Sequence, residues 1–332
     1  MNRFTEVVPE LKLSTHTRIG MKLLDYFFLL RPIVMIPIWF FFLIGLWHAG
    51  YELNPSPLGR WIPHSRELAA LIIYSMIGGG IYIINQIYDL ETDRANHKLF
   101  LLSDGYISLR AAWIYWVVLN SIGLAAAFLF SSVFFWCAVS SVLLGILYSV
   151  RPFHFKGRPL LDMLSNAIGN GWLNTLAGYL VWKSYPGNFT FIMLPYMAAT
   201  ASVYLATTIA DIPGDRLAGD RTTGVWLGIR TTGLIAVVLL GFSILISSRQ
   251  HNWLALIPAV ISFPFFIRAA YRLNVSDFLR AARICTTLMA IGIGLIFPWF
   301  ILFLGVILLL SRWYYFHRFG LIYPAILTRD RT

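Results

Sequence analysis

Residues 85–98 read NQIYDLETDRANHK and close a long apolar stretch that begins near Leu68. Asn85, Asp89 and Asp93 are spaced four residues apart, so on a helix they project from one face, about one turn apart. Two carboxylates this close repel each other unless a cation or a shared proton lies between them. Mg²⁺ is typically held by one or two carboxylates together with substrate phosphates. The stretch therefore predicts a Mg²⁺ site for a phosphorylated ligand, with Asp89 and Asp93 as metal ligands.

A second acidic stretch, DIPGDRLAGDR, starts at Asp211 and again follows an apolar run. Asp211 and Asp215 repeat the four-residue spacing, which predicts a second pair of metal ligands. Pro213 and Gly214 are expected to interrupt the helix. On a continuous helix Asp220 would face away from Asp211, so it can join the site only if the loop folds back.

The composition identifies a polytopic membrane protein. Hydrophobic residues make up 58% of the 332 residues and charged residues only 12%, against about 25% charged in soluble domains. The net charge of +11 comes from basic residues scattered over loops between spans, which in a membrane protein reports topology rather than nucleic-acid binding. Cys137 and Cys285 lie inside apolar runs and are interpreted as core residues.

Apolar stretches near the roughly 20 residues that cross a bilayer predict an all-α bundle of about nine transmembrane helices in a single domain spanning residues 1–332, with 1–25 as a cytoplasmic leader. The predicted spans cover approximately 26–47, 68–88, 111–130, 133–150, 161–182, 190–210, 232–248, 253–271 and 284–311. Pro298 in the last run predicts either a kink or a break that returns the tail. The acidic motifs close spans two and six, which suggests a four-helix unit used twice.

The distribution of Lys and Arg predicts the orientation. The leader and the loops on its side carry 18 of these residues, whereas the loops on the opposite side carry 4. The positive-inside rule therefore places the first side, with both acidic motifs, in the cytoplasm. Basic side chains on this face are candidates for binding phosphate oxygens that Mg²⁺ leaves free. They are Arg94, Lys98, Arg151, Lys156, Arg158, Arg216 and Arg221.

These residues together resemble the UbiA-type superfamily of intramembrane prenyltransferases over nearly the whole chain. The first motif is similar to the family's N-x-x-x-D-x-x-x-D, in a form closest to the branch that prenylates homogentisate and chlorophyllide. The second is similar to the family's D-x-x-x-D followed by Gly219-Asp220. A third stretch, YSVRPFHFKG from Tyr148, is similar to the basic loop after span four, but has Arg151 where relatives carry proline and His154 where they carry arginine.

The resemblance implies a helical bundle around a central cavity. In that family the Asp motifs bind Mg²⁺ ions that hold the diphosphate of an isoprenyl donor, and Asn85, Tyr148, His154, Lys156 and Asp220 are carried over as substrate-binding positions. Ionisation of the allylic C–O bond gives a carbocation, which an electron-rich, aromatic or lipid-like acceptor attacks. The partners implied are a prenyl diphosphate, a small-molecule acceptor and the lipid bilayer, without nucleic acid.

Three alternatives stay open at this point. A terpene cyclase or a sugar-phosphate transferase on the same scaffold would give a different product mass. A cation transporter would conduct ions and would place its acids near mid-membrane. Tyr148, His154 and Asp162 all lie near the cytoplasmic ends of spans four and five, and none of them is singled out as a base for the acceptor.

Overall fold

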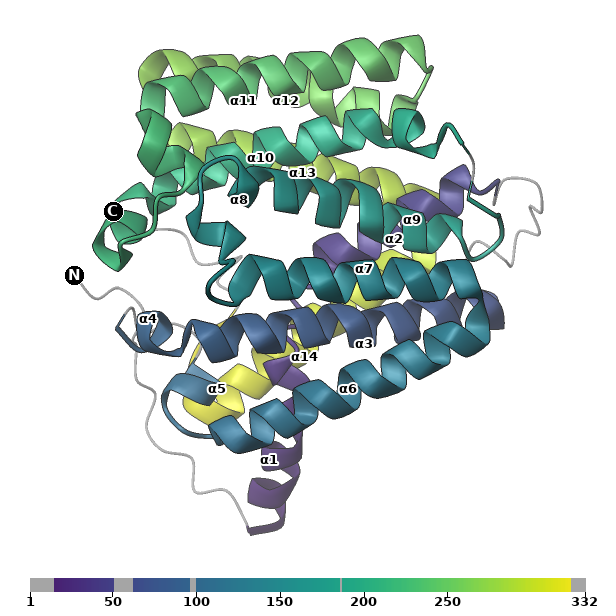
Figure 1. Cartoon of the computed structure of the whole chain (residues 1–332), viewed down its shortest axis with the longest axis vertical. Coiled ribbons are helices and arrows are strands. Elements are labelled where there is room, and N and C mark those ends of the chain that lie inside the picture. The colour runs from purple at the N-terminus through teal and green to yellow at the C-terminus, as the bar shows by residue number, and fades with distance from the viewer. Residues whose placement is uncertain (1–14, 51–61, 96–99, 186, 324–332) are drawn as a thin grey trace.

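The structure, a computed structural model, describes residues 15–50, 62–95, 100–185 and 187–323, and every regular element in those ranges is a helix (Figure 1). Eight of the described helices are long and apolar enough to cross a membrane. They are α3 (Ser65–Tyr88), α6 (Leu109–Phe130), α7 (Ser132–Ser149), α10 (Phe189–Ala218), α11 (Thr223–Arg249), α12 (Trp253–Arg272), α13 (Val275–Ile296) and α14 (Pro298–Phe319). The predicted all-helical membrane bundle is confirmed.

Two further apolar segments complete the bundle. The short helix α2 (Ile36–His48) is apolar along its length. The other segment consists of α8 (Leu161–Asn166), the π-helical turns η3 (Ala167–Asn174) and α9 (Thr175–Tyr179), which follow one another without a gap. This second segment occupies the predicted fifth span.

The first predicted span is wrong in one respect, because it is two helices rather than one. Helix α1 (Thr15–Leu29) ends before a turn, and α2 starts only at Ile36. Arg31 between them has a φ of 59° and precedes Pro32. A proline disfavours helical backbone in the residue before it and cannot donate a helical hydrogen bond, so the chain changes direction here. The predicted leader therefore overlaps a helix.

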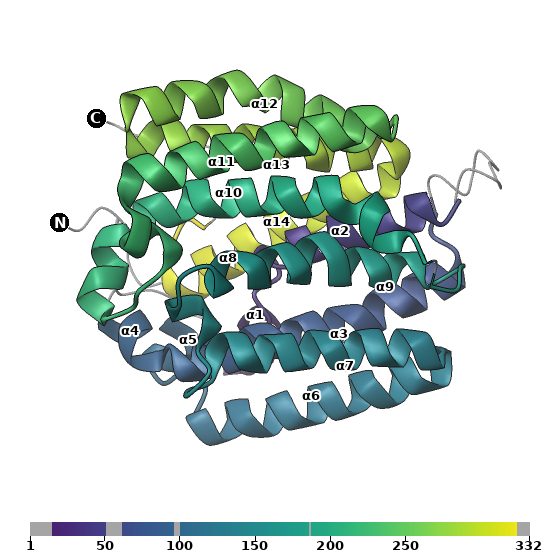
Figure 2. The same cartoon turned by 45° about the horizontal axis from the view of Figure 1, so that its top comes forward.

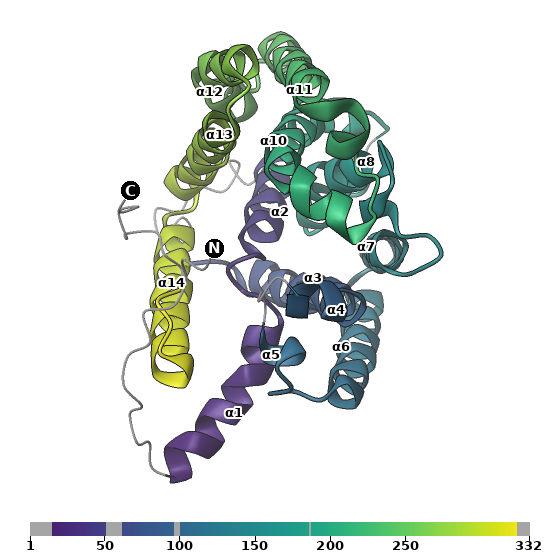
Figure 3. The ribbon, with the colours of Figure 1, turned by 90° about the vertical axis from the view of Figure 1, so that its left-hand side faces the viewer.

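The last apolar run is broken at Phe297, whose φ of −119° and ψ of 78° are not helical, and Pro298 starts α14. The far end of α14 returns to α1: the Tyr314 hydroxyl donates to Asp25 Oδ1 at 2.5 Å, and Arg318 Nη2 lies 2.9 Å from Asp25 Oδ2. Figure 3 shows the lower end of α14 near α1. Of the two sequence alternatives, a kink or a return, the structure has the return.

The short helix α2 lies at the centre of the bundle. Figures 2 and 3 show it between α3 on one side and α10 and α13 on the other. Nine consecutive residues of α2, 38–46, are buried, as expected for a helix that is apolar all round. Gly45 and Gly178 let α2 and α9 pack backbone to backbone, because a Cβ on either would collide with a carbonyl oxygen of the other helix.

Candidate active site

The first acidic motif lies where α3 ends. Asp89 caps the helix with φ −94° and ψ 4°, and the chain turns into the short helix α4 (Leu90–Ala95), which carries Asp93. The four-residue hydrogen bonds persist through the bend, since the Asp89 N–H donates to Asn85 O at 2.9 Å and the Asp93 N–H to Asp89 O at 2.7 Å. The motif is therefore helical but bent at Asp89, its middle residue, and does not form a straight row.

The second motif lies in the last two turns of α10. Contrary to the sequence prediction, Pro213 and Gly214 do not interrupt this helix, which continues to Ala218. A proline near a helix end removes one backbone hydrogen bond, but the turns that follow it keep their own hydrogen bonds and stay helical. The helix ends at Gly219, whose φ of 77° is left-handed, and the Asp220 N–H then donates back to Asp215 O at 2.9 Å. The loop folds back and returns Asp220 toward Asp215.

The loop between α7 and α8 joins the two motifs. Lys156 Nζ donates to Asp89 Oδ1, an ion pair whose side chains are 15% and 21% exposed. Two residues earlier, His154 Nε2 lies 2.9 Å from Asp220 Oδ1. One loop therefore contacts a carboxylate at the end of α3 and another at the end of α10, so both acidic motifs lie on the same face of the bundle.

Gly157 allows this loop to pack closely. A Cβ on Gly157 would lie 2.5 Å from Asp220 Oδ1 and 2.6 Å from His154 Cδ2, so a larger residue has no room without displacing the pair. Its carbonyl oxygen accepts the Arg221 N–H at 3.0 Å. The position requires glycine for close approach rather than for an unusual backbone angle.

The Lys156 ammonium group lies among several carboxylates. Burial lowers the pKa of Lys156 to about 8, against the opposing attraction of Asp220 and Asp215. Asp211 and Asp220 both interact electrostatically with Asp215, whose Oδ2 accepts from the Thr222 hydroxyl at 2.9 Å. Lys156 stays mostly protonated at pH 7 and lies among three of the motif carboxylates.

The other predicted residues have different surroundings. The Arg94 guanidinium donates twice to Ser103 O, at 3.1 and 2.9 Å, and so joins the two ends of the loop that follows the first motif. Tyr148 lies deeper, where its hydroxyl accepts from Asn166 Nδ2 at 3.3 Å. Arg151, Arg216 and Arg221 are exposed beside the site. Lys98 lies outside the described residues.

Asp162 is held by structural contacts. It is fully buried, and its carboxylate accepts from the Thr223 hydroxyl, from the Thr223 N–H at 2.8 Å and from the Met163 N–H at 2.8 Å. These bonds join the start of α8 to the start of α11, beside the second motif. Sequence reasoning missed Thr222 and Thr223, although a threonine before an apolar run is a typical helix N-cap, and Thr222 caps α11.

The acidic motifs offer Mg²⁺ one pair of carboxylates each, and not a cluster of three or more ligands. Within the described ranges, no three His, Cys, Asp or Glu side chains come together as a metal site. Mg²⁺ usually keeps waters and takes one or two carboxylates together with phosphate oxygens, and each motif offers one such pair, Asp89 with Asp93 and Asp211 with Asp215. The metal-ligand assignment remains a prediction.

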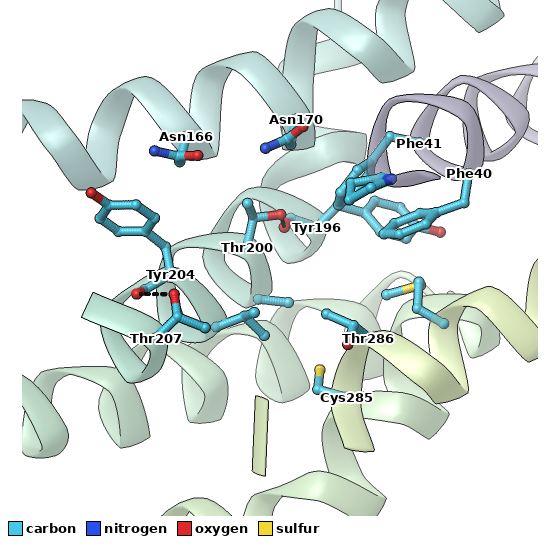
Figure 4. A pocket seen from close by; sticks show the side chains of 14 residues that line it. Phe40, Phe41, Asn166, Asn170, Tyr196, Thr200, Tyr204, Thr207, Cys285 and Thr286 are labelled. Carbon is cyan, nitrogen blue, oxygen red and sulfur yellow. Dashed lines mark hydrogen bonds between the residues drawn. The ribbon is translucent and has the colours of Figure 1, made fainter. Parts of the chain in front are cut away.

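A cavity of about 170 Å³ lies inside the bundle (Figure 4). Asn166 and Asn170 face Thr200 and Tyr204 of α10 across it, and the aromatic rings of α2 close one end. Tyr204 precedes Asp211 by seven residues, or about two helical turns, so the wall of the cavity leads to the second motif. All fourteen lining residues are Pro37, Phe40, Phe41, Asn166, Asn170, Tyr196, Ala199, Thr200, Val203, Tyr204, Thr207, Cys285, Thr286 and Met289.

Known proteins share this sequence pattern and this fold. The model of the UbiA prenyltransferase family matches residues 38–282. Digeranylgeranylglyceryl phosphate synthase of Sulfolobus acidocaldarius is 29% identical over 183 residues, which cover 54% of this chain and 64% of that protein. Probable homogentisate phytyltransferase 2 of Oryza sativa subsp. japonica is 27% identical over 261 residues, 75% of this chain and 62% of that protein. The chain thus spans less than two thirds of the length of either relative.

A solved structure shares the fold: a UbiA homolog from Archaeoglobus fulgidus bound to GPP and Mg²⁺ superimposes with a TM-score of 0.59 at 22% identity, covering 82% of this chain and 99% of that one. At this identity the likeness concerns the fold alone. The family match, in contrast, extends over most of the sequence, from α2 into α13. The chain is a multi-pass integral membrane protein and belongs to the UbiA prenyltransferase family.

Proposed function

We propose that this protein transfers an isoprenyl group from a prenyl diphosphate to an electron-rich, aromatic or lipid-like acceptor, and that it depends on Mg²⁺. The observation that carries the proposal is the meeting of two acidic motifs on one face, joined by the loop of Lys156 and His154, at the end of an internal cavity. Membership of the family and the GPP and Mg²⁺ bound to the Archaeoglobus homolog support it.

The diphosphate end of the donor would lie among the acidic motifs. Asp89, Asp93, Asp211 and Asp215 would hold Mg²⁺, with Asn85 beside them, and the bound metal would supply Lewis-acid neutralisation of the leaving diphosphate. Lys156 pairs with Asp89, and its positive charge limits repulsion between the motifs. Its ammonium group is placed to turn toward phosphate oxygens when the donor binds. Exposed Arg216 and Arg221 add positive charge at the rim.

The prenyl chain would lie in the cavity, which excludes water from the reacting carbon. The allylic C–O bond breaks and its electron pair leaves with the diphosphate. An electron-rich carbon or oxygen of the acceptor then forms the new bond and loses a proton. Tyr204, Phe40 and Phe41 line the cavity, and aromatic faces can stabilise a passing cation. Asp162 is excluded as acceptor base in this account, because its oxygens already accept three hydrogen bonds.

We also propose that the acidic face is cytoplasmic. Eighteen Lys and Arg residues belong to the leader and loops on that side and four to the loops on the other. The end of α14 lies on the acidic side too, because Arg318 binds Asp25 of α1 and the Phe319 ring packs 5.0 Å from Tyr106, which follows the first motif.

A product assay tests the proposal. The purified protein in nanodiscs is given geranyl, farnesyl or geranylgeranyl diphosphate with homogentisate or a glycerol-phosphate lipid, and lipid products are identified by mass. A mass gain of one prenyl group on an acceptor supports transfer. A cyclised hydrocarbon formed without an acceptor would replace the proposal by cyclisation, and product from sugar-phosphate donors only would point to that class of transferase. Ion flux in liposomes without any product would contradict an enzyme function.

A further inference from the structure

A second cavity, of about 260 Å³, lies between α12 and α13 and is lined mainly by arginine. Its lining residues are Phe265, Arg268, Asp277, Arg280, Arg283 and Ile284. Three arginines and one aspartate line it, so the lining carries a net positive charge. We propose that it binds the phosphate headgroup of an anionic membrane lipid.

This cavity is separate from the candidate active site. The two share no lining residue. On α13, positions 277, 280 and 284 form one helical face, whereas Thr286 and Met289 of the first cavity lie on the opposite face. The helix therefore passes between the two cavities, and the lipid site does not depend on the proposed prenyl transfer.

The arginines keep free donors for a ligand. Asp277 is 8% exposed, and its oxygens lie 3.9 Å from Arg268 Nε and 3.7 Å from Arg280 Nη1. Both distances are longer than a hydrogen bond. Asp277 therefore attracts the two side chains by charge, and their N–H groups stay available as donors. Across the described residues, no hydrogen bond uses the guanidinium of Arg268, Arg280 or Arg283 as donor. A phosphate accepts several such donors at once, often in pairs from one arginine.

The position of the cavity favours a lipid over a soluble phosphate. The turn between α12 and α13 is on the side of the acidic motifs. Phe278, near the start of α13, packs against Gly233 of α11. Gly233 is only ten residues from the start of α11, which lies beside the second acidic motif. A stripe of exposed apolar side chains on α12 leads up to the arginines at four- and three-residue spacing: Ile257, Ile261 and Phe265 are 52%, 46% and 42% exposed and precede Arg268. An acyl chain can lie along this stripe while its phosphate reaches the guanidinium groups at the membrane surface.

The test is a titration of the purified full-length protein with three probes: dioctanoyl phosphatidylglycerol, dioctanoyl phosphatidylcholine and inorganic phosphate. Native mass spectrometry counts bound lipid, and the thermal unfolding midpoint gives a second readout. Wild type is expected to bind phosphatidylglycerol saturably and at least about tenfold more tightly than phosphatidylcholine or inorganic phosphate. Equal binding of inorganic phosphate would overturn the lipid assignment, and equal binding of both lipids would overturn the headgroup site.

The variant R280Q/R283Q locates the site. The Arg280 side chain is 70% exposed, so its replacement leaves the core intact. The matched control R230Q/R272Q removes the same charge, from exposed positions on the same face that do not line the cavity. Phosphatidylglycerol affinity should fall about tenfold or more in R280Q/R283Q and less than about twofold in the control. An equal loss in both variants would mean that only the overall charge attracts the lipid, and would refute the site.

Discussion

Lys156 and Asp89 form an ion pair across 67 residues of sequence, between the loop after α7 and the end of α3. The ammonium group also lies within the field of Asp215 and Asp220 from the other motif. One lysine thus interacts with both acidic motifs, where two sets of carboxylates would otherwise repel each other. The pair therefore places a positive charge between the two acidic motifs.

Lys156 should give the enzyme an alkaline limit. In the proposed function the protonated form would bind phosphate, and this form is present below a pKa of about 8 and lost above it. We therefore expect kcat/KM for the prenyl diphosphate to fall as the pH rises through about 8, since this ratio reports the free enzyme. Lys156→Arg should retain activity at pH 9, because arginine stays charged, whereas Lys156→Met should lose about 10-fold or more at pH 7. An unchanged pH profile in Lys156→Arg would rule out this role.

Gly157→Ala should disturb the site without unfolding the bundle. Its new Cβ would displace the His154–Asp220 pair, so we expect turnover to fall about tenfold or more, because misplaced positioning groups lose the reacting geometry. Gly305→Ala, at a helical position with no atom within 4 Å of the added Cβ, is the matched control and should keep wild-type activity. Full activity in Gly157→Ala would show that the loop tolerates rearrangement.

Asp162 should contribute to the stability of the fold and not to the prenyl-transfer step. Asp162→Asn removes charge-assisted bonds to Thr223, with an expected cost of about 1–3 kcal/mol and a lower thermal unfolding midpoint. Thr223→Val should have a similar effect, since it removes the hydroxyl of the same contact. A stable but inactive Asp162→Asn protein would instead identify Asp162 as a participant in the reaction.

The aromatic end of the cavity should limit donor length. Phe41→Leu shortens a ring that lines the cavity, and we expect the ratio of geranylgeranyl to geranyl turnover to rise severalfold. Phe42→Leu is the control, because Phe42 is fully buried beside it but does not line the cavity. Its cost of about 1–2 kcal/mol should lower stability without changing the donor ratio. A parallel change in both variants would place the prenyl chain elsewhere.

The helical class, most spans and the common face of the acidic motifs follow from sequence, because hydrophobic length and charge asymmetry are local properties. Contacts between distant segments do not. No local pattern pairs Lys156 with Asp89, and the return of Asp220 depends on the left-handed turn at Gly219. The contact between α14 and α1 joins Asp25 to Arg318, which are 293 residues apart. Pro32 indicates the helix break at Arg31. The helix nevertheless continues through Pro213, so a proline alone does not predict where a helix ends.

A single preparation in nanodiscs, with and without Mg²⁺, allows diphosphate release and prenylated product to be measured together for wild type, Asp89→Asn and Asp211→Asn. The asparagines keep the size of each side chain and remove one charge from each motif. We predict Mg²⁺-dependent transfer in wild type and a loss of about 100-fold or more in either variant. The exposed-face variant Arg230→Gln should match wild type. Transfer that persists in both Asp variants, or without divalent metal, would show that the two motifs do not hold a metal-bound diphosphate.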